Sequence, residues 1–421
     1  MPAAPRIPPL IKVRRFFDDT RIGDVAAETR RELAASGLAV RPGASIAVAV
    51  GSRGIADGPA VVRETVRFLK EAGARPFLVP AMGSHGGATA EGQAAVLAGY
   101  GITEEAVGAP VRSSMEVVEL PARGGALPVP VYMDRLAWES DGVVLINRVK
   151  PHTSFHGFPE SGLMKMAVIG LGKHAQALAV HARGVPGLKT LILPAARRVL
   201  SSGRVVLGIA VVENAHDRIC ALRAVLPPDI ERVEEELLAL ARSRMPALPV
   251  RDIDVLLVDE IGKDVSGVGM DPNVIGRLRV YGQPEPEFPS VRCIVACGLT
   301  DATHGNANGM GLADVVTRRL ADRVDFQATY ANTLTSTFLE RGKLPLVAPT
   351  DRKAMETALE TSWLDPAAEP RVIRIRSTLR LATLYVSHPV LEEMRGLERV
   401  ETEGDFADPF DAEGRLTPFD G

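Results

Sequence analysis

Hydrophobic and polar positions alternate along the chain with two different periods. Short runs rich in β-branched residues, such as SIAVAV at 45–50, have the composition and length of buried strands. Longer segments with apolar residues three and four positions apart, such as AVVRETVRFLKEAG at 60–73, have the pattern of amphipathic helices. Strands that alternate with helices form mainly parallel sheets covered by helices, so this pattern predicts an α/β fold.

The predicted elements fall into two sets. In the first set we expect strands at 45–50, 75–80, 115–120, 142–147 and 205–214, and helices at 60–73, 90–101 and 229–245. After a proline-containing connection at 246–252, a second set follows, with strands at 254–260 and 292–299, a helix at 312–324 and further α/β segments at 343–349 and 351–362. We therefore predict two α/β domains, 1–245 and 246–421, and expect residues 408–421 to form a loose terminus.

Composition narrows the classes of function. The 421 residues are enough for two domains with cores of their own, and 49 Lys plus Arg against 52 Asp plus Glu favour neither nucleic acid nor an anionic membrane surface. The prolines near the start do not fit a signal peptide, and we find no membrane-spanning apolar run, so we expect a cytoplasmic protein. The three cysteines are too few for a disulfide framework, and we expect Cys293 and Cys297 to be buried.

Glycine-rich loops follow three of the predicted strands, at 51–57, at 83–89 and at the start of the segment 150–181. Ligands of open parallel sheets collect at the carboxyl ends of the strands, and glycine lets backbone N–H groups approach them closely. Thr89 has the position of a helix N-cap after the second loop. We expect these loops to face one cleft, with the active site between the two domains.

The segment 150–181 contains four of the eight histidines of the chain. It is not a phosphate-binding loop, because Ala167 stands in place of the first glycine and His174 in place of the Ser or Thr that binds magnesium. Each histidine alone has an ordinary explanation as a cap, turn or surface residue. Together with His85 in the loop at 83–89, however, the segment can bring several imidazoles and Lys165 to one cleft.

These residues carry a resemblance to a known family. AMGSHGGAT at 81–89, and the Lys-Pro-His, Ser-Gly, Lys165 and His181 positions of 150–181, resemble the signature of the nickel-pincer-nucleotide-dependent lactate racemases. The resemblance implies that His85 and His152 are the catalytic pair, that Lys165 attaches the cofactor covalently, and that His181, sixteen positions later, binds nickel. It also implies that the cofactor lies beside three small residues, Ser84, Gly170 and Gly172.

The substrate-binding positions differ more from that family. Arg53 resembles an arginine that holds the substrate. Arg277, Arg279 or Lys263 takes the place of the carboxylate-binding lysine. The stretch between His152 and Lys165 is longer than in the family and contains an additional histidine, His156. These changes surround the substrate rather than the metal, so the cofactor is better supported than lactate as the substrate.

The resemblance implies a racemase or epimerase of a small 2-hydroxy acid that obtains its cofactor from cofactor-synthesis enzymes. A pyridinium cofactor that takes hydride avoids a carbanion at C2, and two histidines can handle the hydroxyl proton on opposite faces. Two alternatives stay open. One is a zinc- or other metal-dependent hydrolase that uses His85, His152, His156 and His181, and the other is a non-catalytic protein that binds an anion or a nucleotide.

Overall fold

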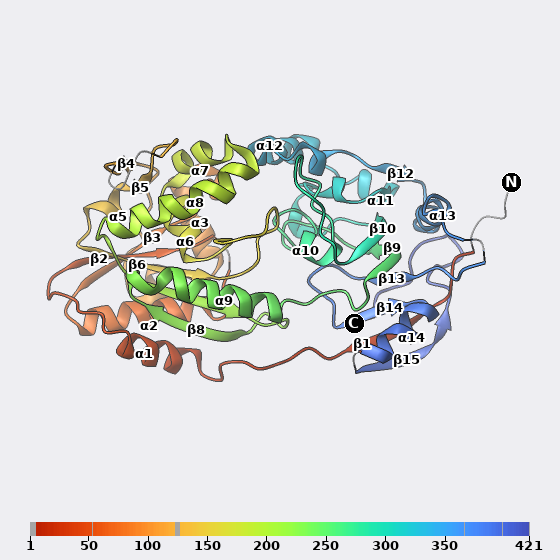
Figure 1. Ribbon diagram of the computed structural model, residues 1–421, viewed down its shortest axis with the longest axis horizontal. Helices are drawn as coiled ribbons and strands as arrows, with labels where there is room; N and C mark the ends of the chain where they lie inside the picture. Colours follow the sequence, from red (N-terminus) through yellow and green to blue (C-terminus); the bar gives the residue numbers. More distant parts are fainter. Residues whose placement is uncertain (1–5, 53, 123–126, 366, 398, 421) are drawn as a thin grey trace. The chain divides into compact units, whose positions relative to one another are not determined.

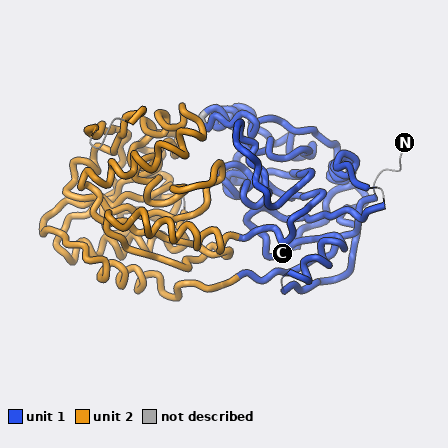
Figure 2. Tube along the Cα trace, in the orientation of Figure 1, with its two compact units in different colours: residues 1–17, 246–421 blue, residues 18–245 orange. Residues whose placement is uncertain are grey.

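The chain divides into two compact units (Figure 2). The computed structural model describes residues 6–52, 54–122, 127–365, 367–397 and 399–420. Residues 18–245 form one unit, here called the site unit, and residues 1–17 with 246–421 form the second unit. The expected boundary after residue 245 coincides with this division, but the N-terminal segment was expected in the other domain.

The site unit is built on a parallel sheet. Its strands lie in the order β3 (Arg75–Pro80), β2 (Ser45–Val50), β6 (Gly142–Arg148), β7 (Val205–Glu213) and β8 (Ile219–Val225). The first four are parallel to their neighbours, and β8 is antiparallel to β7. A small antiparallel pair, β4 (Val117–Glu119) and β5 (Tyr132–Asp134), stands apart from this sheet. All four strand predictions for the main sheet match within one residue: 45–50 and 75–80 have the observed bounds, 142–147 ends one residue too early and 205–214 ends one residue too late.

Helices cover both faces of the sheet (Figure 1). On one face, Val62 and Leu69 of α2 (Gly58–Glu71) and Leu33 of α1 (Val25–Ala35) pack with alternate strand residues such as Val48. On the other face, Gly208 of β7 leaves room for α6 (Leu163–Lys165) and for the start of α9 (Ile230–Arg244). The remaining helices are α3 (Ala90–Gly99), α4 (Glu104–Val107), α5 (Arg135–Glu139), α7 (Lys173–His181) and α8 (Gly184–Ser201), with a π-helical turn at Met166–Gly170.

The second unit contains a mixed sheet. Its order is β12 (Leu346–Ala348), β11 (Val315–Thr317), β10 (Ser290–Ala296), β9 (Asp252–Val258), β13 (Val372–Ile375), β14 (Thr383–Val386), β1 (Leu10–Arg15) and β15 (Val400–Ala407). The first five strands are parallel, and Cys293 and Cys297 are buried among them as expected. Its helices are α10 (Pro272–Ile275), α11 (Arg318–Ala321), α12 (Phe326–Ser336), α13 (Asp351–Thr361) and α14 (His388–Leu397). The fold class is thus α/β with mainly parallel sheets.

The N-terminal strand belongs to this second sheet. β1 pairs antiparallel with β14 on one side and with β15 on the other, and Val13 is completely buried. The assignment of the first residues to a domain 1–245 is therefore wrong, because their partners lie almost the whole chain length away.

Two local predictions for the second unit were also wrong. The expected helix at 312–324 is instead the strand β11 followed by the short helix α11, whose N-terminal turn is capped when Thr317 Oγ1 accepts from Leu320 N at 3.3 Å. The β-branched Val315 and Val316 pair with β10 and β12, and this pairing overrides the helical spacing. The tail is not loose either, since Phe410 is buried and Thr417 O accepts from Arg374 Nη2 at 2.6 Å.

Candidate functional site

The predicted residues of the site unit lie at the carboxyl ends of its parallel strands. β2, β3 and β6 are hydrogen-bonded neighbours that run in the same direction, so their exit loops lie at one edge of the sheet. The loop after β3 carries His85, and the loop after β6 carries His152 and leads into α6 with Lys165. Thr89 caps α3 as predicted, accepting from Gly92 N at 3.0 Å. This register places segments that are distant in sequence along the same edge.

Lys165 and His152 are in direct contact. Lys165 Nζ lies 2.5 Å from His152 Nε2, and His152 is buried, with 7% of its surface exposed. The other ring nitrogen, Nδ1, accepts a hydrogen bond from Ser154 N at 3.1 Å. Nδ1 is therefore engaged within the loop, and Nε2 is the ring nitrogen that faces Lys165.

A buried carboxylate shapes the loop that carries His152. Glu160 accepts from His152 N at 2.6 Å, from Gly157 N at 2.9 Å and from Arg242 Nη2 at 2.6 Å. Burial alone would raise the pKa of Glu160, but hydrogen bonds from His156, the two backbone amides and Arg242 lower it below its ordinary value. His156, whose Nδ1 lies 3.6 Å from Glu160 Oε1, is therefore an exposed partner of this carboxylate.

His181 at the end of α7 is held neutral. Burial, together with the positive charge of Lys165, lowers the pKa of His181 to about 4. Because the charge of Lys165 changes the pKa of His181, these two side chains lie within electrostatic range of each other. The structure thus brings together Lys165, His152 and His181, three of the residues selected from sequence.

His85 is exposed, and the backbone of its loop is hydrogen-bonded to the segment that follows Lys165. Gly83 N donates to Gly170 O at 3.3 Å, which links the loop after β3 to the π-helical turn that follows Lys165. Ser84 is half-buried between Gly83 and His85. The position of the His85 side chain relative to Lys165 stays a prediction, whereas the link between their backbone segments is direct.

Gly170 and Gly172 have a packing reason to be glycine. A Cβ at Gly170 would lie 2.7 Å from Ala81 O, and one at Gly172 would lie 2.3 Å from Gln176 Cβ. Neither distance leaves room for a side chain. Their role beside a cofactor stays a prediction, because close packing is sufficient to explain both.

The predicted substrate-binding residues are less well supported. Arg53 lies outside the described residues. Lys263, in the second unit, donates to Gly267 O at 2.6 Å and contacts Asn332 Oδ1. Arg277 is buried in the same unit, where its guanidinium pairs with Asp314 at 2.5 Å and donates to Leu312 O at 3.1 Å and Val291 O at 2.9 Å. We therefore assign Arg277 a structural role and do not retain it as a carboxylate ligand.

Sequence reasoning missed a glutamate behind the Lys165 segment. Glu234 of α9 is buried, and its carboxylate Oε2 accepts from Met164 N at 3.0 Å. Burial raises the pKa of Glu234 to about 7, although hydrogen bonds from Met164 N and Leu163 N oppose the rise. In the sequence this residue is one of several glutamates on an amphipathic helix, and only its inward-facing position in the helical repeat indicated burial.

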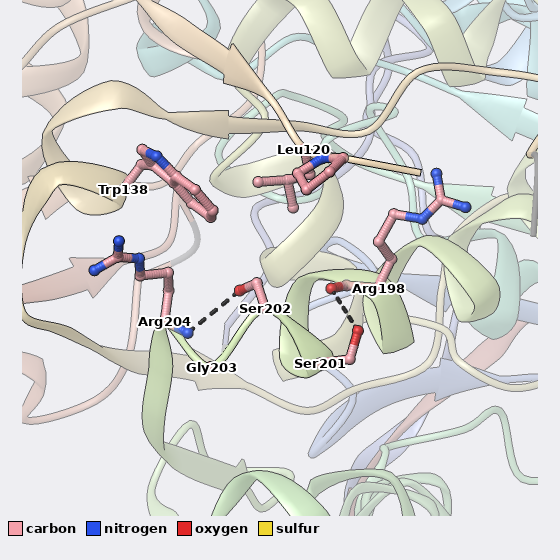
Figure 3. Close-up of a pocket in the computed structure, with 8 residues that line it drawn as sticks. Leu120, Trp138, Arg198, Ser201, Ser202, Gly203 and Arg204 are labelled. Atoms are coloured by element: carbon pink, nitrogen blue, oxygen red, sulfur yellow. Dashed lines mark hydrogen bonds between the residues drawn. The ribbon is translucent and has the colours of Figure 1, made fainter. Parts of the chain in front are cut away.

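A separate cavity of about 360 Å³ lies at the opposite ends of the parallel strands, beside the amino ends of β6 and β7. Figure 3 shows the residues that line it. Trp138, Arg198 and Arg204 line it, and Arg204 directly precedes β7, near the amino end of β6. Arg204 also stacks on Trp138, with 4.8 Å from its guanidinium carbon to the ring centroid. None of the residues selected from sequence contributes to this cavity, so it is not the predicted site.

The described residues contain neither a metal-binding cluster nor a membrane-spanning helix. No group of three or more His, Cys, Asp or Glu side chains is arranged to hold a metal ion in the part of the chain that the structure describes. Within the same residues, no helix combines the length and apolar character needed to cross a membrane.

Comparison with known proteins places this geometry in context. The lactate racemase apoprotein from Thermoanaerobacterium thermosaccharolyticum is similar in structure, with a TM-score of 0.51 and 12% sequence identity over 88% of this chain and 99% of that chain. At this identity the likeness establishes a shared fold. No curated protein matches the sequence. A family model described as a domain of unknown function (DUF362) matches residues 46–261, just over half of the chain and nearly all of the site unit. The chain therefore belongs to the DUF362 family.

Proposed function

We propose that this protein interconverts the configurations at C2 of a small 2-hydroxy acid with the help of a nickel-pincer nucleotide. The observation that supports this most directly is the contact between Lys165 and His152, with His181 within electrostatic range. The sequence resemblance assigned these residues to cofactor attachment, proton transfer and nickel binding. The shared fold with a lactate racemase is consistent with that assignment.

The chemistry of the side chains fits the cofactor. Only a neutral imidazole binds a metal, and a pKa of about 4 keeps His181 neutral at physiological pH. A single imidazole is sufficient when the remaining nickel ligands belong to the cofactor. Lys165 supplies an amine for covalent attachment in the same group of side chains. When bound, the nucleotide would supply an acceptor for the hydrogen on substrate C2 together with its two electrons.

The protein residues would handle the hydroxyl proton. Because Nδ1 of His152 is engaged by Ser154 N, Nε2 is the ring atom that exchanges a proton. We assign His85 the same role on the other face of the substrate, so that each direction of the reaction uses one histidine as base and the other as acid. Arg53 and Lys263 remain the candidates for binding the substrate carboxylate, since Arg277 is occupied by protein acceptors.

The first test is the intact mass of protein produced together with the cofactor-synthesis enzymes. Wild type should gain the mass of a covalent adduct, and Lys165→Ala should fold without gaining it. Lys189→Arg, which changes an exposed lysine of α8 in the same unit, is the matched control and should keep the adduct. An adduct that persists in Lys165→Ala, or that maps to Lys173, contradicts the assignment.

A panel of 2-hydroxy acids then tests the non-catalytic alternative. Protein that carries the adduct should racemise or epimerise at least one of them. Adduct formation without turnover on a broad panel would favour the non-catalytic, nucleotide-binding alternative.

A further inference from the structure

A second lysine near the glycines is completely buried and has no role in the function proposed above. The exposed fraction of Lys173 is 0%, and so is that of Asp134, whose Oδ2 lies 3.1 Å from Lys173 Nζ. A buried ammonium is costly unless it is paired and hydrogen-bonded. Lys173 meets this condition by also contacting Pro80 O, at the end of β3, and Gln93 Oε1 at 3.1 Å. This arrangement ties α7 to the strand that leads to His85.

Gln93 continues the connection to the His85 loop. Its side-chain nitrogen Nε2 donates to Gly83 O at 2.9 Å and to His85 O at 3.3 Å. Lysine can only donate and carbonyl oxygens can only accept, so the orientation of the Gln93 amide is determined by its neighbours. A continuous polar chain therefore runs from Asp134 through Lys173 and Gln93 to the carbonyls on either side of Ser84.

The backbone of Lys173 indicates that this position is constrained. Its φ is +53°, in the left-handed region that residues other than glycine usually avoid. Such a conformation persists where the surrounding contacts determine it, as the buried contacts of the Lys173 side chain do. Lys173 begins α7, the helix that ends at His181, so its position is coupled to the metal-binding end of the proposed site.

We propose that Lys173, acting through Gln93, is a positioning residue for His85. The network fixes the backbone on both sides of Ser84 relative to the segment that carries Lys165 and His181. It thereby sets where the His85 imidazole stands. The significance of this position rests on the proposed function, in which His85 exchanges the proton of the substrate, but the positioning itself can be measured without cofactor or substrate.

The decisive variant is Gln93→Glu. Lys173 keeps Asp134 as its charge partner, and an ionised carboxylate at position 93 would accept from Lys173 but could not donate to Gly83 O or His85 O. Gln176→Glu is the matched control. Gln176 is equally buried in the same unit, but it accepts from Tyr132 N at 2.7 Å and donates to Pro130 O at 3.1 Å, away from the His85 loop. The double variant Lys173→Met, Asp134→Asn removes both buried charges together and serves if Gln93→Glu does not fold.

The first readout is the set of side-chain resonances of ¹⁵N-labelled histidine in the full chain, in which the variant His85→Gln identifies the His85 resonance. The second readout is the rate at which diethyl pyrocarbonate modifies His85. Gln93→Glu and the double variant should move the His85 resonance and change its modification rate several-fold, and Gln176→Glu should do neither. An unmoved His85 signal in a folded Gln93→Glu or double variant overturns the proposal. An equal effect of Gln176→Glu also overturns it, because the response would then be general loosening. Neither result depends on whether the protein is a racemase.

Discussion

Glu234 should make the stability of the site unit depend on pH in a way that one substitution removes. Burial raises the pKa of its carboxyl group from the ordinary 4.5 to about 7, so the folded protein binds this proton more tightly than the unfolded chain does. The contribution to folding is fully present below about pH 4.5 and is lost as the pH rises through 7. Glu234→Gln has nearly the same shape and does not titrate, so it should lack this dependence.

The magnitude follows from the two pKa values. Each pH unit between them corresponds to about 1.4 kcal/mol, and the full difference amounts to about 3 kcal/mol. Roughly 2 to 3 kcal/mol of this falls between about pH 5 and pH 8. Relative to wild type, Glu234→Gln should therefore gain about 2 to 3 kcal/mol of unfolding free energy over that interval. Its absolute stability also depends on how well the amide replaces the carboxylate as acceptor for Met164 N.

Urea denaturation of both proteins at several pH values tests this expectation. Subtracting the two curves cancels every other titrating group, including His181, which remains in both. Glu236→Gln is the matched control, because Glu236 lies on the same helix and is exposed beside Arg232, at 2.9 Å. A difference between wild type and Glu234→Gln that stays constant with pH would refute the burial argument, as would an equal pH dependence in Glu236→Gln.

Three further predictions concern the metal, the second unit and the reaction. His181→Ala should lose bound nickel, measured by elemental analysis of the loaded protein, whereas His156→Ala should retain most of it; equal losses would contradict a single protein ligand. Arg374→Met should destabilise the second unit by about 3 to 5 kcal/mol in denaturant titrations, because it leaves Asp259 buried without the two hydrogen bonds of 2.9 and 2.7 Å. The exposed Arg376→Met should cost no more than about 1 kcal/mol. Substrate deuterated at C2 should keep its deuterium on inversion in light water, as mass spectrometry of the product can show, and extensive washout would exclude hydride transfer.

Local sequence patterns were sufficient for the elements that carry the site. The strands at 45–50 and 75–80 lie where their apolar runs predict, since a strand covered on both faces needs hydrophobic residues throughout. The cap at Thr89 depends only on residues within one helical turn. The family resemblance likewise selected His152, Lys165 and His181, side chains that the fold brings into one group.

Long-range pairing in the tertiary structure decided the sheet partners of β1 and β11, which no local sequence pattern indicates. No pattern near Leu10–Arg15 indicates that this strand lies between β14 and β15, because its partners are determined by sheet edges formed some 370 residues later in the chain. The segment 312–324 has helical spacing, yet Val315 and Val316 join a sheet whose neighbouring strands are absent from any local window. The same holds for single side chains. Arg277 and Lys173 are both basic residues near glycines, and only the acceptors that folding places around them, Asp314 and Asp134, give each its role.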